Sequence, residues 1–96
     1  MKMFLVVYSQ AVDDDIVAKF KQAGIRYYTK MEEVRGEGTE TEPKLGTHTW
    51  PGANNLLLIV VGDEEVNRAS DLIRRLKKDH PRAGVKGFIL PIEESI

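Results

Sequence analysis

A pattern that occurs twice along the 96 residues constrains the fold of this chain more than any other feature. Apolar runs at 3–7 and 56–61 are each followed by an acidic cluster, and then by apolar residues at helical spacing. Apolar runs of this length are typical of strands that are buried on both faces. The acidic clusters indicate helix starts, because carboxylates stabilise the positive end of the helix dipole. Each half of the chain is therefore expected to hold a buried strand followed by a helix.

The limits of the two helices are predicted from residues that favour helix ends. Asp13 and Asp63 are expected to act as the N-caps, and Gly24 is expected at the C-cap of the first helix. Lys77 and Lys78 suit the last turn of the second helix, which Pro81 ends.

Two further strands complete the halves. Along residues 25–34, alternate side chains would fall on the two opposite sides of a strand, which predicts a long, half-buried strand. Residues 87–92 predict a short last strand, which Pro91 favours at a sheet edge. The element order is then βαββαβ. With right-handed crossovers this order gives an α+β, ferredoxin-like fold, in which a four-stranded antiparallel sheet carries two helices on one face.

The chain is expected to form one domain over residues 1–96, with a loop inserted at about 36–53. The helices leave the opposite face of the sheet uncovered, and the alternation in the second strand would place Tyr27 or Tyr28 there. A partner subunit is expected to cover that face.

Composition narrows the classes of function. Fourteen basic and fifteen acidic residues give a net charge of -1, which argues against a nucleic-acid binder with a basic face. The chain has no cysteine, so disulfides, thiolate catalysis and thiolate zinc sites are excluded. The histidines are His48 and His80, and neither has a local Ser-His-Asp context, which disfavours an enzyme. The apolar run at 3–7 is too short for a signal peptide or a membrane span, and a cytoplasmic location is expected.

The long polar stretch "VRGEGTETEPKLGTHTWPG" at 34–52 is the main candidate for a functional segment, because polar loops of this length are uncommon in compact domains. Gly36 and Gly38 are able to turn backbone N–H groups toward an anion, although a simple exit turn is the favoured explanation of a bare Gly-x-Gly. His48 with Glu40 and Glu42 offers ligands for a divalent metal, at a spacing that matches no firm metal motif.

Two other residues each have two possible roles. Trp50 either anchors the returning end of the loop or stacks on the ring of a ligand. Lys86 precedes the last strand and either reaches an anion or is a solvated lysine at the strand start.

The segments "EVRGEG", "NNLLLIVVGDEEVNRASDLIRRL" and "GVKGFILPIEE" resemble the PII signalling family over nearly the whole chain. This resemblance implies a homotrimer of ferredoxin-like subunits that binds adenine nucleotides in clefts between the subunits. It also implies that the loop at 36–53 corresponds to the T-loop, through which such proteins contact transporters, enzymes or regulators. CutA-type trimers share the fold, and some have a Trp-Pro-Gly before an apolar strand, as here.

The resemblance assigns roles to individual residues. Gly36 and Gly38 match the glycines at the T-loop base that approach the phosphates, Lys86 matches a phosphate-reaching lysine, and Thr29 lies on the strand that lines the nucleotide site. The residues that the resemblance places in the partner-contacting loop are Glu37, Thr39, Glu40, Lys44 and Trp50.

The sequence also departs from the family pattern. Thr39-Glu40 replaces the Arg-Gln of the family, and the family's C-terminal arginines have no counterpart up to Ile96. A carboxylate at this point repels a phosphate, so ordinary ATP and 2-oxoglutarate sensing is not expected. An ADP-type nucleotide, another small anion or a divalent metal is expected in place of ATP.

The leading hypothesis from the sequence is a non-enzymatic, PII-like regulatory trimer that binds a small effector and contacts a partner, such as a membrane transporter or a regulated enzyme, through residues 37–52. The alternative is a CutA-like, metal-responsive trimer that uses His48. An enzyme or a purely structural oligomer is the weaker third class.

Overall fold

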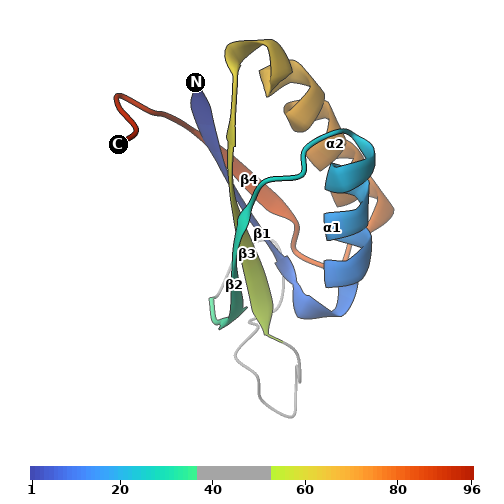
Figure 1. Cartoon of the computed structure of the whole chain (residues 1–96). Helices are drawn as coiled ribbons and strands as arrows, with labels where there is room; N and C mark the ends of the chain where they lie inside the picture. The colour runs from blue at the N-terminus through green and yellow to red at the C-terminus, as the bar shows by residue number, and fades with distance from the viewer. Residues whose placement is uncertain (37–52) are drawn as a thin grey trace.

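The computed structural model describes residues 1–36 and 53–96. The elements in chain order are β1 (Lys2–Ser9), η1 (Gln10–Val12), α1 (Asp13–Gln22), β2 (Thr29–Val34), β3 (Asn54–Val61), η2 (Asp63–Glu65), α2 (Val66–Asp79) and β4 (Lys86–Pro91). The four strands form one antiparallel sheet in the order β2-β3-β1-β4, and both helices lie on the same face of it (Figure 1). The predicted ferredoxin-like fold is therefore confirmed.

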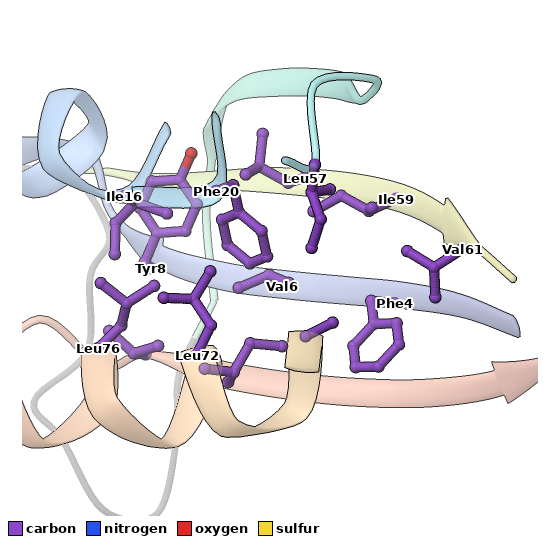
Figure 2. Packing of buried hydrophobic residues seen from close by; sticks show 14 of the residues in the cluster. Phe4, Val6, Tyr8, Ile16, Phe20, Leu57, Ile59, Val61, Leu72 and Leu76 are labelled. Atoms are coloured by element: carbon purple, nitrogen blue, oxygen red, sulfur yellow. The ribbon is translucent and has the colours of Figure 1, made fainter. Parts of the chain in front are cut away.

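The core lies between the sheet and the two helices. Every second residue of β1 faces the helices, namely Phe4, Val6 and Tyr8, and all three are fully buried. Their partners on β3 face the same way because paired residues of antiparallel strands share a face. The helices close this layer with the buried side chains of Ile16, Phe20, Ala69, Leu72, Ile73 and Leu76 (Figure 2). Burial of each large apolar side chain contributes about 1.5–3 kcal/mol to folding.

The other face of the sheet carries no helix and is largely apolar. The register places Met3, Leu5 and Val7 of β1 on this open face, together with their partners on the neighbouring strands. These partners are Leu56, Leu58 and Val60 on β3, and Lys86, Phe88 and Leu90 on β4. Val60 and Phe88 are about half exposed in the single chain. The open face is thus largely apolar, and neither of the two helices lies over it.

The strand predicted over residues 25–34 begins at Thr29, four residues later than expected. Residues 23–25 end the first helix in a Schellman motif, in which Ile25 N–H donates to Phe20 O at 2.9 Å and Gly24 N–H donates to Lys21 O at 3.0 Å. Gly24 has the left-handed backbone that this motif requires, with φ at 85°, as its predicted place at the helix end implied. The motif sends the Ile25 side chain into the core, where it is 5% exposed. The alternation in the sequence was therefore wrong as a sign of strand at 25–28.

The two tyrosines of that segment also lie outside β2. Tyr28 is partly buried and packs against the core, whereas Tyr27 is 87% exposed. The sequence predicted that β2 would place one of them on the open face, and this is wrong because both precede the strand.

The predicted N-caps at Asp13 and Asp63 are also wrong. In each half a short 3₁₀ turn precedes the helix, so that α1 has Val12 at its N-cap and α2 has Glu65. Asp13 is instead the first residue of α1, and its carboxylate points to the sheet. The Asp63 carboxylate accepts a hydrogen bond from the amino group of Met1. Both aspartates still lie near helix starts, as the charge pattern indicated.

Candidate functional site at the loop end of the sheet

Two of the predicted site residues, Gly36 and Lys86, lie at the same end of the sheet. There, β2 ends at Val34 and β3 begins at Asn54, which pair with each other, and Ser9 at the end of β1 pairs with Asn54 from the other side. Lys86 begins β4 and pairs with Val7. We call this end of the sheet the loop end, because residues 37–52 connect β2 to β3 here. Lys86, which begins the edge strand β4, and Gly36, which lies two residues beyond the end of the opposite edge strand β2, are therefore both at the loop end.

Backbone hydrogen bonds hold this end together. Ser9 N–H donates to Ala83 O at 2.7 Å, and Gln10 N–H donates to Ala53 O at 2.8 Å. The first bond fixes the turn before β4, and the second fixes the point at which the chain returns to β3. The start of β4, and with it Lys86, is thus held against the end of β1.

Thr29 does not join Lys86 within one chain. Thr29 pairs with Leu58 at the far edge of the sheet, on β2, whereas Lys86 is on β4. Adjacent strands are about 4.8 Å apart, so two edge strands separated by three spacings are roughly 14 Å apart. Within one chain these two predicted ligand-binding residues therefore do not lie side by side.

Gly36 does not have the left-handed backbone that the sequence allowed for it. A Cβ on Gly36 would meet nothing within 4 Å, and its φ lies outside the positive range. The positive φ in this region belongs to Glu33, at 58°. The special backbone geometry of the loop base therefore lies in β2 itself, three positions before the glycine.

That geometry is a β-bulge. β2 and β3 pair regularly as far as Met31 and Leu56, and the next pair is Val34 with Asn54. Two residues of β2, Glu32 and Glu33, therefore face the single residue Asn55 of β3. The side chain of Asn55 compensates for the broken ladder, because its Oδ1 accepts a hydrogen bond of 3.3 Å from Glu33 N–H.

Asn55 belongs to a polar cluster at the edge of the core, which we call the Asp13 network and which consists of Tyr8, Asp13, Lys30 and Asn55. Tyr8 OH donates to Asp13 Oδ1 at 2.6 Å, and Asn55 Nδ2 donates to the same oxygen at 3.0 Å. Lys30 Nζ donates to Asp13 Oδ2 at 2.9 Å. Tyr8 and Asn55 are both essentially unexposed, and Figure 2 shows the Tyr8 ring within the apolar cluster.

The charges in this network reinforce one another. Burial acts to raise the pKa of Asp13, but the hydrogen bonds from Tyr8, Lys30 and Asn55 outweigh it and hold that pKa below its ordinary value. The hydrogen bond to Asp13 raises the pKa of Lys30. Burial and the bond to Asp13 raise the pKa of Tyr8 far above its usual range. At neutral pH the network thus holds an ionised carboxylate, an ammonium and a neutral phenol that donates.

Sequence reasoning missed this network. It assigned Asp13 to a helix cap and gave no role to Lys30 or Asn55. The available signal was Asn55 at the start of an otherwise apolar run, since a buried amide requires hydrogen-bond partners.

A shallow pocket of about 240 Å³ lies between α2 and β4, and Lys86 is on its rim. Besides Lys86, the residues that line it are Phe4, Ser70, Ile73, Arg74, Lys77, Gly87 and Ile89. Lys77 Nζ donates to Val85 O at 3.2 Å, which fastens α2 to the turn before β4. Lys86 is exposed and lines this pocket together with Arg74 and Lys77, and its predicted contact with an anion stays a prediction.

Most of the predicted loop residues lie outside the part of the chain that the structure describes. They are Glu37, Gly38, Thr39, Glu40, Lys44, His48 and Trp50. The metal and partner-contact hypotheses that rest on them stay predictions. Within residues 1–36 and 53–96, His, Asp and Glu side chains form no group of three that is able to hold a metal ion.

His80 contacts Asp15 in the described part of the chain. Its Nε2 lies 2.7 Å from Asp15 Oδ2, and Lys19 Nζ lies 3.1 Å from the other oxygen of Asp15. The group joins the end of α2 to the first turn of α1. Hydrogen bonds from His80 and Lys19 lower the pKa of Asp15.

Comparison with known proteins decides the family. The family model described as "Nitrogen regulatory protein P-II" matches residues 1–96. The chain belongs to the PII family. A relative of this PII protein, nitrogen fixation nifHD region GlnB-like protein 1 of Methanothermococcus thermolithotrophicus, is 32% identical over 96 residues, which cover 99% of this chain and 90% of the relative.

Solved structures share the fold of this PII protein. CPII, a nitrogen regulatory PII-like protein from Thiomonas intermedia K12 bound to ADP, AMP and bicarbonate, matches with a TM-score of 0.68 and 16% identity, over 99% of this chain and 94% of CPII. CPII bound to ADP, AMP and acetate matches with a TM-score of 0.74 and 16% identity, over 99% of this chain and 88% of CPII. At this identity the likeness shows the fold.

No helix in the described part of the PII protein is both long and apolar enough to cross a membrane. The predicted cytoplasmic location stays a prediction.

Proposed function

We propose that this PII-family protein is a non-enzymatic regulator that works as a homotrimer, binds an ADP-type adenine nucleotide in clefts between subunits, and signals through residues 37–52. The observation that carries the proposal is the place of Lys86. It begins β4 at the loop end, on the rim of a cationic pocket and beside the uncovered face of the sheet. A phosphate bound there would lie at the same end of the sheet as the base of the loop, so that in the proposed assembly binding would be felt where a loop leaves the sheet.

The trimer is supported by the open face and by the separation of two candidate site residues. A continuous apolar face without a helix is the surface that a second copy of the chain would cover. Thr29 and Lys86 lie on opposite edges of the sheet, and in the proposed assembly Thr29 of one subunit would come toward Lys86 of another. The site is thus proposed to be complete only in the assembly.

The class of nucleotide follows from charge. Lys86 supplies a cation for phosphate, whereas Thr39-Glu40 puts a carboxylate where the family has Arg-Gln. Fewer phosphate charges reduce the repulsion from that carboxylate, which favours ADP or AMP over ATP. The structural neighbours bound to ADP and AMP support the same class.

The loop is proposed to contact a membrane transporter or a regulated enzyme. Its acidic residues Glu37, Glu40 and Glu42 outnumber its basic residue Lys44, so a basic surface on the partner is favoured.

Isothermal titration calorimetry of the purified protein with ADP, AMP and ATP tests the proposal. We expect ADP to bind more tightly than ATP, and Lys86→Ala to weaken ADP binding by about tenfold, the loss of one charge-assisted contact. Lys78→Ala is the matched control, because Lys78 is exposed on α2 and does not line the pocket. A protein shown to be trimeric by native mass spectrometry that binds none of the three nucleotides would overturn the proposal.

A further inference from the structure

The Asp13 network is an unusual way to fill this part of the core. The Asp13 side chain is only 16% exposed, and its charge must be compensated by the three donors that surround it. A helix start does not need this residue to turn inward, since Asp14 and Asp15 lie in the same first turn. Well-packed apolar residues in place of a buried ion pair are often at least as stable, so the pair is weak evidence for a role in stability alone.

The network is joined to β2 at two points. Its member Lys30 lies on β2 before the bulge, and within the bulge the backbone N–H of Glu33 donates to Asn55. Glu33 has a left-handed backbone without being a glycine, a conformation that persists only where neighbouring groups hold it. Asn55, which is 1% exposed and bonded to Asp13 and Glu33 at once, is the group that does so.

The bulge determines which face of the sheet the loop base presents. Side chains alternate along a strand, so one extra residue reverses the faces of all residues after it. With the bulge, Val34 pairs with Asn54 and shares its face, which is the open face. Without it, Glu33 would take the place opposite Asn54, and Val34 and Gly36 would each present the opposite face. The bulge therefore sets the direction in which the chain enters the loop.

We propose that Asp13, Lys30 and Asn55 are positioning residues for the ligand site at the loop end: through the bulge at Glu33 they fix the direction in which β2 leads into Gly36. The predicted effect of these residues on ADP affinity rests on the proposed nucleotide binding. The network touches neither Lys86 nor the open face, so its effect is transmitted through the course of β2.

The experiment compares Asn55→Leu, Asp13→Asn and Lys30→Met with the wild type, using ADP as the probe. Asn55→Leu keeps the volume of the site but removes both hydrogen bonds of the amide. We expect each variant to weaken ADP binding by about tenfold, the effect of misplacing a site without touching it. Lys30→Arg keeps the charge and the donor and should retain the wild-type affinity. Asp14→Asn is the matched control on the same turn of α1, because Asp14 is not part of the network.

A second measurement reads the bulge itself, without any ligand. In the wild type, NMR should show the cross-strand contact between Val34 and Asn54, and slow hydrogen exchange of the Glu33 amide. In Asn55→Leu we expect that contact to be lost and the exchange to become faster, while the β1–β3 contacts persist. Since Lys30 is the most exposed member of the network, Lys30→Met supplies the same readout if a variant of the buried residues does not fold.

The outcomes separate this inference from the proposed function. If the wild type binds ADP and the three variants bind it equally well, the positioning role is wrong and the proposed function stands. If the wild type binds none of ADP, AMP and ATP, the proposed function is wrong, and the NMR contact decides whether the network sets the bulge. An unchanged Val34–Asn54 contact in both Asn55→Leu and Lys30→Met overturns the inference in either case.

Discussion

Asn55 donates a hydrogen bond of 3.0 Å to Asp13, which is 42 positions away in the sequence, and so ties the start of β3 to the start of α1. The same amide accepts the Glu33 N–H, which brings β2 into the connection. One side chain therefore joins three elements at the end of the sheet where the loop leaves and returns. The contact gives this end a defined geometry that packing of apolar side chains alone would specify less sharply.

The charge state of Asp13 makes part of the stability depend on pH. Its pKa is lowered in the folded chain, so its contribution is fully present above the unfolded pKa of about 4 and is lost as pH falls through the folded pKa. We expect the free energy of unfolding to fall in the wild type as pH is lowered from about 5 to 3. The fall should be smaller in Asp13→Asn, which has no carboxylate to titrate there. Urea denaturation followed by circular dichroism at each pH measures both proteins, and equal slopes would contradict the prediction.

The sequence predicted the fold because its strongest signals are local and repeated. The apolar run of β3 and the apolar stripe of α2 each define an element without reference to the rest of the chain, and Pro91 correctly placed β4 at an edge. The order of such elements leaves few ways to close a sheet. The resemblance to the family gave Lys86 the role of a phosphate-reaching lysine; the structure places it at the start of β4, and the role stays a prediction.

The sequence did not predict the bulge or the role of Asp13, because both depend on partners from distant segments. An aspartate before a helix is a normal N-cap by local rules, and only the fold brings Tyr8, Lys30 and Asn55 to it. The left-handed residue is a glutamate, which carries no signal of the kind that a glycine would give.

Gly87 is expected to be required for the packing of β4 against α2. A Cβ at this position would lie 3.0 Å from Ile73 Cγ2 and 3.1 Å from Ile73 Cδ1, which is closer than side chains normally pack. Since Ile73 is buried, Gly87→Ala should lower the free energy of unfolding by about 1–3 kcal/mol. Gly36→Ala is the matched control, because its Cβ would meet no atom within 4 Å. Chemical denaturation of the two variants gives the comparison, and equal stabilities would mean that Ile73 moves aside without cost.

Substitution of Gly24, at the end of α1, is expected to destabilise the protein through backbone strain. Its Cβ would lie 3.9 Å from the nearest atom, Arg68 Nη2, so there is space for a side chain. Its φ of 85° is nevertheless unfavourable for any residue with a Cβ. Gly24→Ala should therefore cost about 1 kcal/mol through backbone strain alone. Gly24→Asn should cost less, since asparagine tolerates the left-handed region better. If thermal denaturation ranks Asn below Ala, strain is not the cause.

The open face of the sheet provides the test of assembly. Phe88 lies on this face and is 50% exposed in the single chain, so a charge there leaves the core of the subunit intact. In a trimer that buries the face, Phe88→Glu would place an unpaired carboxylate in an apolar interface, which is strongly unfavourable. We expect the wild type to elute as a trimer in size-exclusion chromatography with light scattering, and Phe88→Glu as a monomer with unchanged circular dichroism. Asn67→Glu, on the exposed side of α2, introduces the same charge away from the face and should stay trimeric. A Phe88→Glu protein that remains a trimer would show that the subunits assemble through another surface, and the proposed meeting of Thr29 and Lys86 across this face would then be wrong.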